Sequence, residues 1–435
     1  MKNNCIIIIG IILCMNSCRM PEDPLGEMTI IMRLETINTG GDCLDLDVDI
    51  IDSVLVAAAN YNGYFIYKLT SNNGVISVTT NPTHISADEM DANLGDNRAQ
   101  SVIMSKKHNI AFVIDMYDHI WLYKYENGAA QYVSPNYLEE DCYGSTWLSV
   151  AIDDKQDSIG VFTLLKHNAA EEDFGDFLEY STSLIWTNLN GVDPSSTSLD
   201  QNDPNCEYII NQGSIAEKIY FDNGLLSLAY GELGVRVFQQ TEDEVCLTET
   251  GFVDLDDNEL CAEHLYPDGS ENAGEIDYSS CCENTACPTG IGECPWLEEG
   301  FGGVFSSAGG IIPQIYAEYD TPGEAQAIYS TDNTIFAGLT LSNGCMLAIL
   351  DTDGSVISTH QFAIGHTIKG IHSDNNLLAL AAGHDGILIY YWNGNDVSLM
   401  GKIETAYANN VKVAGNIIFA ATEDGIEIIQ IDHTH

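Results

Sequence analysis

The sequence predicts an all-β fold, a seven-bladed β-propeller, from a repeated β unit, seven matching anchor positions and a spare strand near the N-terminus. The unit is most regular at residues 366–432, which contain it twice. Each copy has three apolar runs, and the second and third runs are separated by His384-Asp385-Gly386 or by Glu423-Asp424-Gly425. Asp-Gly between β-rich runs is a strong hairpin signal. A β unit of about 40 residues that repeats along a chain is typical of propeller blades.

The same unit recurs along the chain with insertions of different lengths. Its runs, such as LLALAA and ILIYYW, are apolar at successive residues, so both faces of each sheet must be covered. Neighbouring blades of a propeller provide that cover. Seven innermost strands are expected, and their anchor residues are Val48, Val102, Val150, Ile219, Ile328, Ile371 and Val413.

The last unit contains three strands instead of four. Residues 29–38 (TIIMRLETIN) precede the first inner strand just as residues 397–406 (VSLMGKIETA) precede the seventh. We therefore expect the N-terminal strand to pair with the last blade, at residues 416–432. This pairing would close the ring and remove an exposed sheet edge.

The repeated unit resembles the LVIVD repeat. The match is good at residues 40–70 and 366–432, where an inner strand, Gly or Asn, an apolar strand, Asn-Gly or Asp-Gly and a third strand follow one another. It is looser in the other units. LVIVD repeats occur in bacterial surface and secreted β-propeller proteins, so the resemblance implies a propeller fold and an extracytoplasmic location. It supplies no catalytic residue, because the motif is structural.

The composition is strongly acidic. Fifteen Lys and Arg stand against 65 Asp and Glu, which gives a formal net charge of −50. Such a surface repels polyanions wherever salt does not screen it. Nucleic acid is therefore excluded as an expected partner.

The N-terminus has the features of an export signal. A basic start precedes an apolar stretch of about eleven residues, which is too short to span a bilayer. Met15-Asn16-Ser17-Cys18 resembles a bacterial lipobox, although Asn16 departs from the commonest pattern. We expect a signal peptide at 1–17, a lipidated Cys18 with a tether at 18–28 and the propeller at 29–435. The protein would then be exported and held at the outer membrane or cell surface by its lipid alone. An ordinary signal with an incidental cysteine is the alternative.

Thirteen cysteines indicate an oxidising compartment. Apart from the signal and Cys18, ten remain as disulfide candidates: Cys43, Cys142, Cys206, Cys246, Cys261, Cys281, Cys282, Cys287, Cys294 and Cys345. Residues 254–322, rich in Gly, Asp, Glu and Asn, are expected to form a disulfide-stapled insertion between the outer strand of blade four and the inner strand of blade five. A zinc or iron–sulfur site is disfavoured, because the spacing within CCENTACPTGIGEC contains no C-x2-C pair.

Nine of the ten cysteines, all but Cys246, are expected near one face of the disc. That face carries the outer-to-inner connections and the central hairpin turns of the blades. Loops on a rigid frame commonly carry binding function. A protein or glycan ligand is therefore expected on this stapled face.

No cofactor is expected, and loosely bound calcium is the open alternative. Asp254 to Glu259 begins like a calcium loop, but Glu259 stands where glycine is required and no acid stands at the twelfth position. Asp351-Thr352-Asp353-Gly354 fits a hairpin turn better. Loose binding in the insertion or at residues 200–205 stays open.

A set of charged residues is expected on or beside the inner strands, around the axis. The cations are Arg98, Lys218, Lys369 and Lys412, the acids include Asp45 and Asp47, and His366 shares a strand face with His372 by period two. Two interpretations stay open. The residues form internal ion pairs between blades, or they hold an anionic ligand at the axis.

Three functions are compatible with these observations. The leading hypothesis is a surface-exposed, lipid-anchored propeller that binds a protein, a glycan or a matrix component. The first alternative is an extracytoplasmic hydrolase or lyase with an axial site, in which Asp45, Asp47 and His366 would act. The second is a structural subunit of an outer-membrane assembly. No G-x-S-x-G, phosphate-binding glycine loop or H-E-x-x-H motif occurs.

Overall fold

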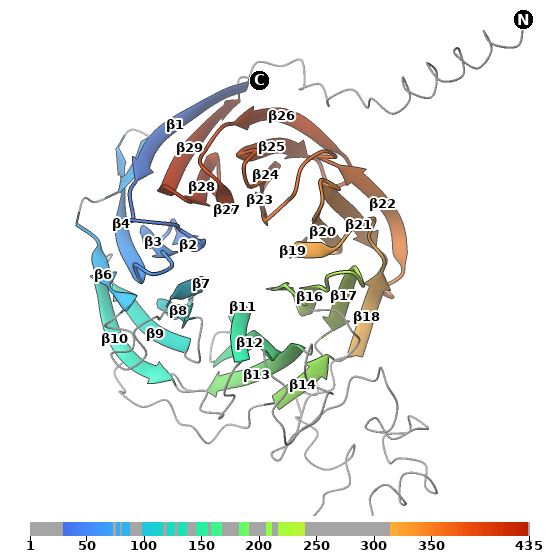
Figure 1. Ribbon diagram of the computed structural model, residues 1–435, viewed down its shortest axis with the longest axis horizontal. Coiled ribbons are helices and arrows are strands. Elements are labelled where there is room, and N and C mark those ends of the chain that lie inside the picture. The colour runs from blue at the N-terminus through green and yellow to red at the C-terminus, as the bar shows by residue number, and fades with distance from the viewer. Residues whose placement is uncertain are drawn as a thin grey trace, which may run out of the picture.

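The computed structural model is a β-propeller in which antiparallel sheets surround a central axis (Figure 1). The residues that the structure describes are 29–72, 75–78, 81–87, 98–115, 120–126, 129–136, 145–154, 158–167, 182–190, 206–210, 216–239 and 314–433. Their strands form seven sheets, which we call blades one to seven. The expected all-β propeller class is confirmed.

Each blade begins with its inner strand and ends with its outer strand. Blade one contains β2 (Asp45–Asp49), β3 (Val54–Ala58), β4 (Tyr64–Asn72) and β5 (Val75–Val78), with β6 (Thr83–Ile85) also paired to β4. Blade two contains β7 (Ala99–Ser105), β8 (Ile110–Asp115), β9 (Ile120–Glu126) and β10 (Ala129–Asn136). Blade three contains β11 (Ser145–Asp154), β12 (Ser158–His167), β13 (Thr182–Asn190) and β14 (Cys206–Ile210).

The remaining blades follow the same order. Blade four contains β15 (Lys218–Asp222), β16 (Leu225–Ala229), β17 (Val235–Gln239) and β18 (Gln314–Tyr319). Blade five contains β19 (Ala325–Thr331), β20 (Thr334–Leu339), β21 (Cys345–Leu350) and β22 (Val356–Phe362). Blade six contains β23 (Gly370–Asp374), β24 (Leu377–Ala381), β25 (Ile387–Trp392) and β26 (Val397–Ile403). Every anchor residue named from the sequence lies in an inner strand.

The first described strand completes blade seven. This blade contains β27 (Ala408–Ala414), β28 (Ile417–Thr422) and β29 (Gly425–His433), and β1 (Thr29–Ile37) pairs antiparallel with β29 from Thr29↔His433 to Ile37↔Ile426. Figure 1 shows this seam, where the blue β1 lies beside the red β29. The predicted closure of the ring by the N-terminal strand is confirmed.

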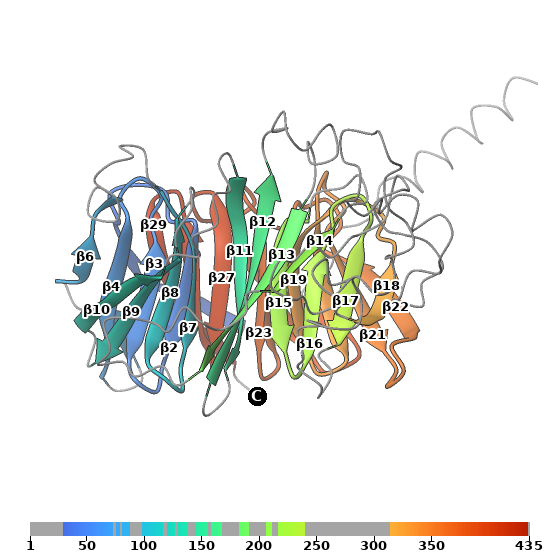
Figure 2. The ribbon, with the colours of Figure 1, turned by 90° about the horizontal axis from the view of Figure 1, so that it is seen from below.

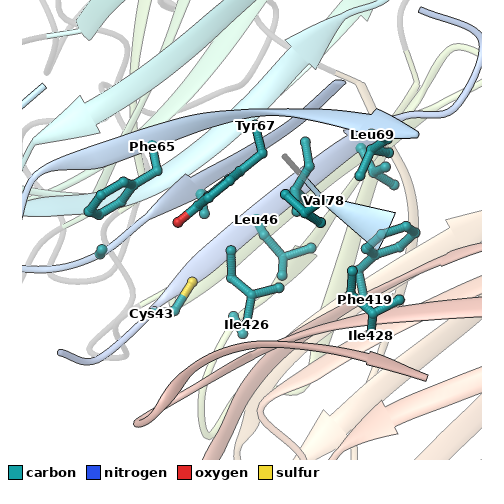
Figure 3. Packing of buried hydrophobic residues seen from close by; sticks show 14 of the residues in the cluster. Cys43, Leu46, Phe65, Tyr67, Leu69, Val78, Phe419, Ile426 and Ile428 are labelled. Carbon is teal, nitrogen blue, oxygen red and sulfur yellow. The ribbon is translucent and has the colours of Figure 1, made fainter. Parts of the chain in front are cut away.

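The hydrophobic core is divided into clusters that lie between neighbouring blades. Seven clusters are present among the described residues, one at each contact between adjacent blades. Figure 3 shows the cluster at the seam, where Leu46 and Tyr67 of blade one pack against Phe419 and Ile428 of blade seven. Burying one such side chain stabilises the fold by about 1.5–3 kcal/mol. Each blade therefore depends on its neighbours, as the runs of successive apolar residues predict.

The two faces of the disc carry different kinds of connection (Figure 2). We call one the hairpin face, because it carries the turns between inner and second strands at 50–53, 106–109, 223–224, 332–333, 375–376 and 415–416. We call the other the connection face. It carries the turns between second and third strands and the links from each outer strand to the next inner strand. Direct bridges on this face, Asn60↔Ala99 and Gly383↔Ala408, join a turn to the start of the following inner strand.

The attachment of the insertion differs from the sequence prediction. Residues 314–319 were expected inside it, yet they form β18, the outer strand of blade four, with Gln314 paired to Gln239 of β17. The long connection therefore leaves the sheet between a third and an outer strand, at the hairpin face. The placement on the connection face is wrong because a short strand, QIYAEY, stands at the end of a Gly-rich stretch and was counted with it. Residues 320–322 begin the link to β19, and residues 254–313 lie outside the described residues.

None of the helical segments in the described ranges combines the length and the apolar character needed to cross a membrane.

Candidate functional site: the axial cavity and the connection face

The inner strands surround a cavity of about 730 Å³. Alternate side chains of an inner strand point toward the axis, because successive residues of a strand face opposite sides. The charged and aromatic residues in its wall include Asp45, Asp47, Lys218, Tyr220, Lys369, His372 and Lys412, with Lys106, Lys107, Asp153, Asp154, Asp222 and Asp332 toward the ends of the strands. The predicted axial set is thus largely brought together.

Asp45 connects three blades. Its Oδ2 accepts hydrogen bonds from Ser101 Oγ at 2.6 Å and from Val102 N at 3.2 Å, both in blade two. Its Oδ1 accepts from Leu46 N at 2.9 Å and from the Asn410 side-chain amide of blade seven. The carboxylate is 4% exposed and fully engaged by neutral donors. A buried carboxylate with this set of donors joins the blades on either side of blade one.

Asp47 repeats the arrangement two residues further along β2. Its Oδ1 accepts from Val48 N and its Oδ2 from Met104 N of blade two, each at 2.9 Å. Lys412 Nζ of blade seven lies 3.7 Å from Asp47 Oδ1, and Lys218 Nζ of blade four lies 3.7 Å from Asp45 Oδ2. The second ion pair crosses the axis, because blades four and one are not neighbours. Ion pairs between blades, one of the two interpretations, are therefore present.

The bond from an inner-strand side chain to the backbone of a neighbouring blade recurs around the ring. Asp222 accepts from Asp332 N at 3.1 Å, and Asp374 accepts from Gly415 N at 2.6 Å. His372 Nδ1 accepts from Val413 N at 3.1 Å, so the proton of the neutral ring lies on Nε2. Burial, reinforced by the charges of Lys412 and Lys106, holds the pKa of His372 well below its usual value. Sequence reasoning missed these bonds, because no pattern marks which inner-strand residue faces the next blade.

Two predicted axial cations, Arg98 and Lys369, each stand just before an inner strand, and only Lys369 lines the cavity. Arg98 stands one residue before β7, and its guanidinium lies 3.9 Å from the centre of the Tyr61 ring, away from the cavity wall. Lys369 stands one residue before β23 and does line the cavity. Its Nζ donates to Gln326 Oε1 at 2.8 Å, and Gln326 Nε2 donates to Ile368 O. The prediction for Arg98 is wrong because a cation–π contact with an aromatic turn residue holds its side chain at the connection face.

His366 is not an axial residue. It lies in the link between β22 and β23, and its Nδ1 is 2.8 Å from Asp385 Oδ2, while Lys402 Nζ is 3.4 Å from Asp385 Oδ1. Burial raises the pKa of Asp385, whereas its contacts with His366 and Lys402 lower it. The net effect is a pKa below the usual value. His366 therefore does not join Asp45 and Asp47, and the proposed catalytic trio is not assembled. The histidine that lines the cavity is His372.

The described cysteines correct part of the disulfide prediction. Cys43 and Cys345 are free thiols with no exposed surface. Burial raises the pKa of both, and Cys43 Sγ contacts Asp45 O at 3.5 Å. The two residues act as small apolar side chains in separate clusters between blades, which is why they have no disulfide partner.

Among the other disulfide candidates, Cys206 is the one that lies within the described residues. Cys206 opens β14, an outer strand, at the hairpin face, so its predicted place before an inner strand on the connection face is wrong. Cys18, Cys142, Cys246, Cys261, Cys281, Cys282, Cys287 and Cys294 lie outside the described residues.

The connection face exposes apolar side chains on ordered loops. Leu341, in the turn of blade five between β20 and β21, is 80% exposed, and Ile364, in the following link, is 38% exposed. Gly365 N donates to Ser342 O at 2.8 Å, which ties the two loops together. Tyr407 and His384 pair edge to face in the corresponding place on blade six, with ring centres 4.7 Å apart.

No group of three or more His, Cys, Asp or Glu side chains is placed to hold a metal ion within the described ranges. Asp351-Thr352-Asp353-Gly354 forms the expected hairpin turn, in which Gly354 N donates to Asp351 O at 3.0 Å. The possible calcium segments at 200–205 and 254–259 lie outside the described residues.

The similar solved structures are remote from this chain, with TM-scores of 0.48 to 0.49. No family model and no curated protein matches the chain. Among solved structures, U3-55K is 11% identical over 94% of this chain and 100% of its own, with a TM-score of 0.48. The WD40 repeats of RRP9 are 10% identical over 95% of this chain and 100% of their own, with a TM-score of 0.49. Raptor of Chaetomium thermophilum is 8% identical over 92% of this chain and 29% of its own, with a TM-score of 0.48. The assignment of the fold rests on the sheets described above.

Proposed function

We propose that this protein is a binding module, a seven-bladed propeller of the LVIVD-repeat type that holds a protein partner on its connection face. A lipid on Cys18 anchors it at the outer membrane or cell surface. β-Propellers commonly serve as protein-interaction modules, because loops on a rigid ring can be varied without disturbing the core. The lipobox-like sequence at residues 15–18 and the resemblance of the repeats support the location.

The observation that carries this proposal is the conformation of the turn at Leu341. Leu341 and Ser342 have φ values of +53° and +63°, in the left-handed region where bulky side chains are rare. Turns that need positive φ at both central residues favour Asn and Gly there. Here the turn instead holds a leucine that is 80% exposed. A strained backbone that displays an apolar side chain on a fixed loop is typical of a contact residue.

The cavity chemistry supports a catalytic role less well. Asp45 and Asp47 are occupied by backbone and side-chain donors, and His366 is held by Asp385 outside the cavity. Acid–base catalysis needs carboxyl groups that can exchange a proton with a substrate. These two carboxylates are already used to join blades.

Site-specific photocrosslinking in the native host tests the proposed face. A photoreactive residue in place of Leu341 should give a discrete protein adduct, and the same residue in place of Ile51 should not. Ile51 is a matched control, because it is 91% exposed on the hairpin face. Leu341→Asp should abolish the partner's co-purification. Equal adducts at both positions, or no loss with Leu341→Asp, would refute the assignment of this face.

The anchor is tested separately. Cys18→Ser should move the protein from the membrane fraction to the soluble fraction and abolish metabolic labelling with a fatty acid. Retention of label in the variant would refute lipidation at Cys18, and the proposal for Leu341 would be unaffected.

A further inference from the structure

The axial cavity holds a large share of the few cationic residues of this acidic protein. Five of the chain's 15 Lys and Arg residues line it: Lys106, Lys107, Lys218, Lys369 and Lys412. Six aspartates line it too, Asp45, Asp47, Asp153, Asp154, Asp222 and Asp332, so the cavity wall is close to neutral in a chain whose formal net charge is −50. Where ammonium groups outnumber carboxylates in one part of such a cavity, small anions are attracted there, because the cavity walls focus the field.

Around Lys218, Lys369 and Lys412, the carboxylates are fewer than the ammonium groups. Three ammonium groups, those of Lys218, Lys369 and Lys412, stand with two carboxylates, those of Asp45 and Asp47. Both carboxylates accept their hydrogen bonds from backbone N–H groups, Ser101 and Asn410. This arrangement leaves one uncompensated positive charge.

The ammonium groups also keep unused hydrogen-bond donors. Lys218 Nζ and Lys412 Nζ each lie 3.7 Å from a carboxylate oxygen, which is within ion-pair range but beyond a hydrogen bond. Lys369 Nζ has one hydrogen bond, to the neutral Gln326 amide. Each ammonium carries three donors. Within the described ranges, these three lysines therefore present most of their donors to the cavity, and the side chains of Lys412 and Lys218 are only 15% and 30% exposed.

The remaining acids of the cavity wall are displaced along the axis. Asp154 and Asp222 end their inner strands and Asp332 follows β19, at the hairpin face. Lys218 begins β15 and Lys369 precedes β23, toward the connection face. Lys106 and Lys107 lie in the 106–109 turn, at the same face as these acids. Near the connection face, Asp45 is the acid beside Lys218 and Lys369, so an anion is favoured at that end of the cavity.

We propose that the axial cavity binds a small oxyanion, a carboxylate or phosphate group, between Lys218, Lys369 and Lys412. Charge-assisted N–H···O⁻ hydrogen bonds to the ammonium groups would supply the affinity. Gln326, which accepts from Lys369 at 2.8 Å, and Asn410, which donates to Asp45 from the same strand as Lys412, are neutral polar residues beside this set. The site is independent of the protein partner proposed for the connection face.

Titration calorimetry at constant ionic strength tests this site, because general salt effects are then held fixed. Inorganic phosphate and citrate are the two probes, and they separate a phosphate site from a carboxylate site. The full-length mature protein should bind at least one of them with a stoichiometry of one. Lys369→Met and Lys412→Met should each weaken binding by about tenfold or more, since each removes a charged donor.

Lys402→Met is the matched control. This substitution also removes one positive charge, but from an exposed lysine that pairs with Asp385 outside the cavity. The affinity of the Lys402→Met protein for phosphate or citrate should therefore stay within about twofold of that of the unaltered protein. Lys369→Arg keeps the charge and should retain binding if the variant protein is folded. Absence of saturable binding of both probes overturns the proposal. So does equal affinity in the Lys369→Met and Lys412→Met proteins, or an equal loss in Lys402→Met.

Discussion

The glycine at the turn into the third strand of a blade gives the sharpest test of the repeat geometry. At Gly386, φ is +76° and an added Cβ would lie 2.3 Å from the carbonyl oxygen of Ile403, the last residue of β26. The same contact recurs in other blades, with 2.0 Å from Gly63 to Ile85 O and 2.1 Å from Gly425 to Ile37 O. The glycine of the repeat is therefore required by two conditions together. The turn needs a positive φ, and the outer strand ends directly against the glycine.

Two alanine substitutions separate these conditions. Gly224 has a φ of +80°, yet nothing lies within 4 Å of its added Cβ, so Gly224→Ala should cost only the left-handed backbone, about 1–2 kcal/mol. Gly386→Ala has the same backbone cost. In addition, the outer strand must move by about 1 Å to reach an ordinary contact, which is overpacking worth about 1–3 kcal/mol more. The free energy of unfolding should thus fall by about 2–5 kcal/mol in Gly386→Ala.

Equilibrium unfolding in urea, followed by circular dichroism, measures the difference between the two variants. Gly386→Ala should unfold at a clearly lower urea concentration than Gly224→Ala, with a similar slope. Gly425→Ala, whose Cβ would meet β1, should behave like Gly386→Ala. Equal midpoints for Gly224→Ala and Gly386→Ala would show that the turn alone requires glycine and that the outer strand is not held against it.

Three further outcomes are expected. Because the pKa of buried His372 lies well below 6.5, the unfolded chain binds a proton there that the folded chain does not, and stability should fall by about 1.4 kcal/mol per pH unit below about pH 6.5. This dependence of stability on pH should be lost in His372→Asn. If the urea midpoints of the variant change with pH as those of the unaltered protein do, His372 is not the group responsible. Burial raises the pKa of Glu427 despite its 2.8 Å ion pair with Arg33, so Arg33→Met should cost about 1–2 kcal/mol at neutral pH and less at about pH 5. An equal loss of stability in Arg33→Met at both pH values would contradict this account of the Arg33–Glu427 ion pair. Cys43 and Cys345 should resist alkylation in the native protein and react after unfolding without reductant, as mass spectrometry would show, whereas labelling before unfolding would show that the thiols are not buried.

Features set by the backbone period could be predicted from the sequence. The anchors Val48 and Val413 lie in inner strands, because a repeat fixes the order of the strands. Residues 29–37 close the last blade, because a strand that is missing from one copy of the repeat must come from another part of the chain. The seven apolar clusters follow from runs that are apolar on both faces. The strand order and the apolar clusters depend on the average composition of each strand, and this can be read from one sequence.

Features set by individual side-chain directions could not be predicted. His366 and His372 satisfy period two, yet the strand begins at Gly370, so His366 lies in a loop and turns to Asp385. Arg98 precedes its strand by one residue and stacks on Tyr61. The sequence reveals which residues are near an inner strand, but the first residue of that strand decides which of them face the axis.

The recurring bonds between blades also change the meaning of the acidic composition. Asp47 accepts a backbone N–H from an inner strand of a neighbouring blade, and Asp222 and Asp374 each accept one from the turn that follows such a strand. A buried carboxylate that accepts such a bond joins its own blade to the next one. Part of the acidity is therefore structural, and it holds the ring together near the axis. Asp47 accepts backbone hydrogen bonds as well as pairing with Lys412 at 3.7 Å, so Lys412 keeps hydrogen-bond donors for the oxyanion proposed above.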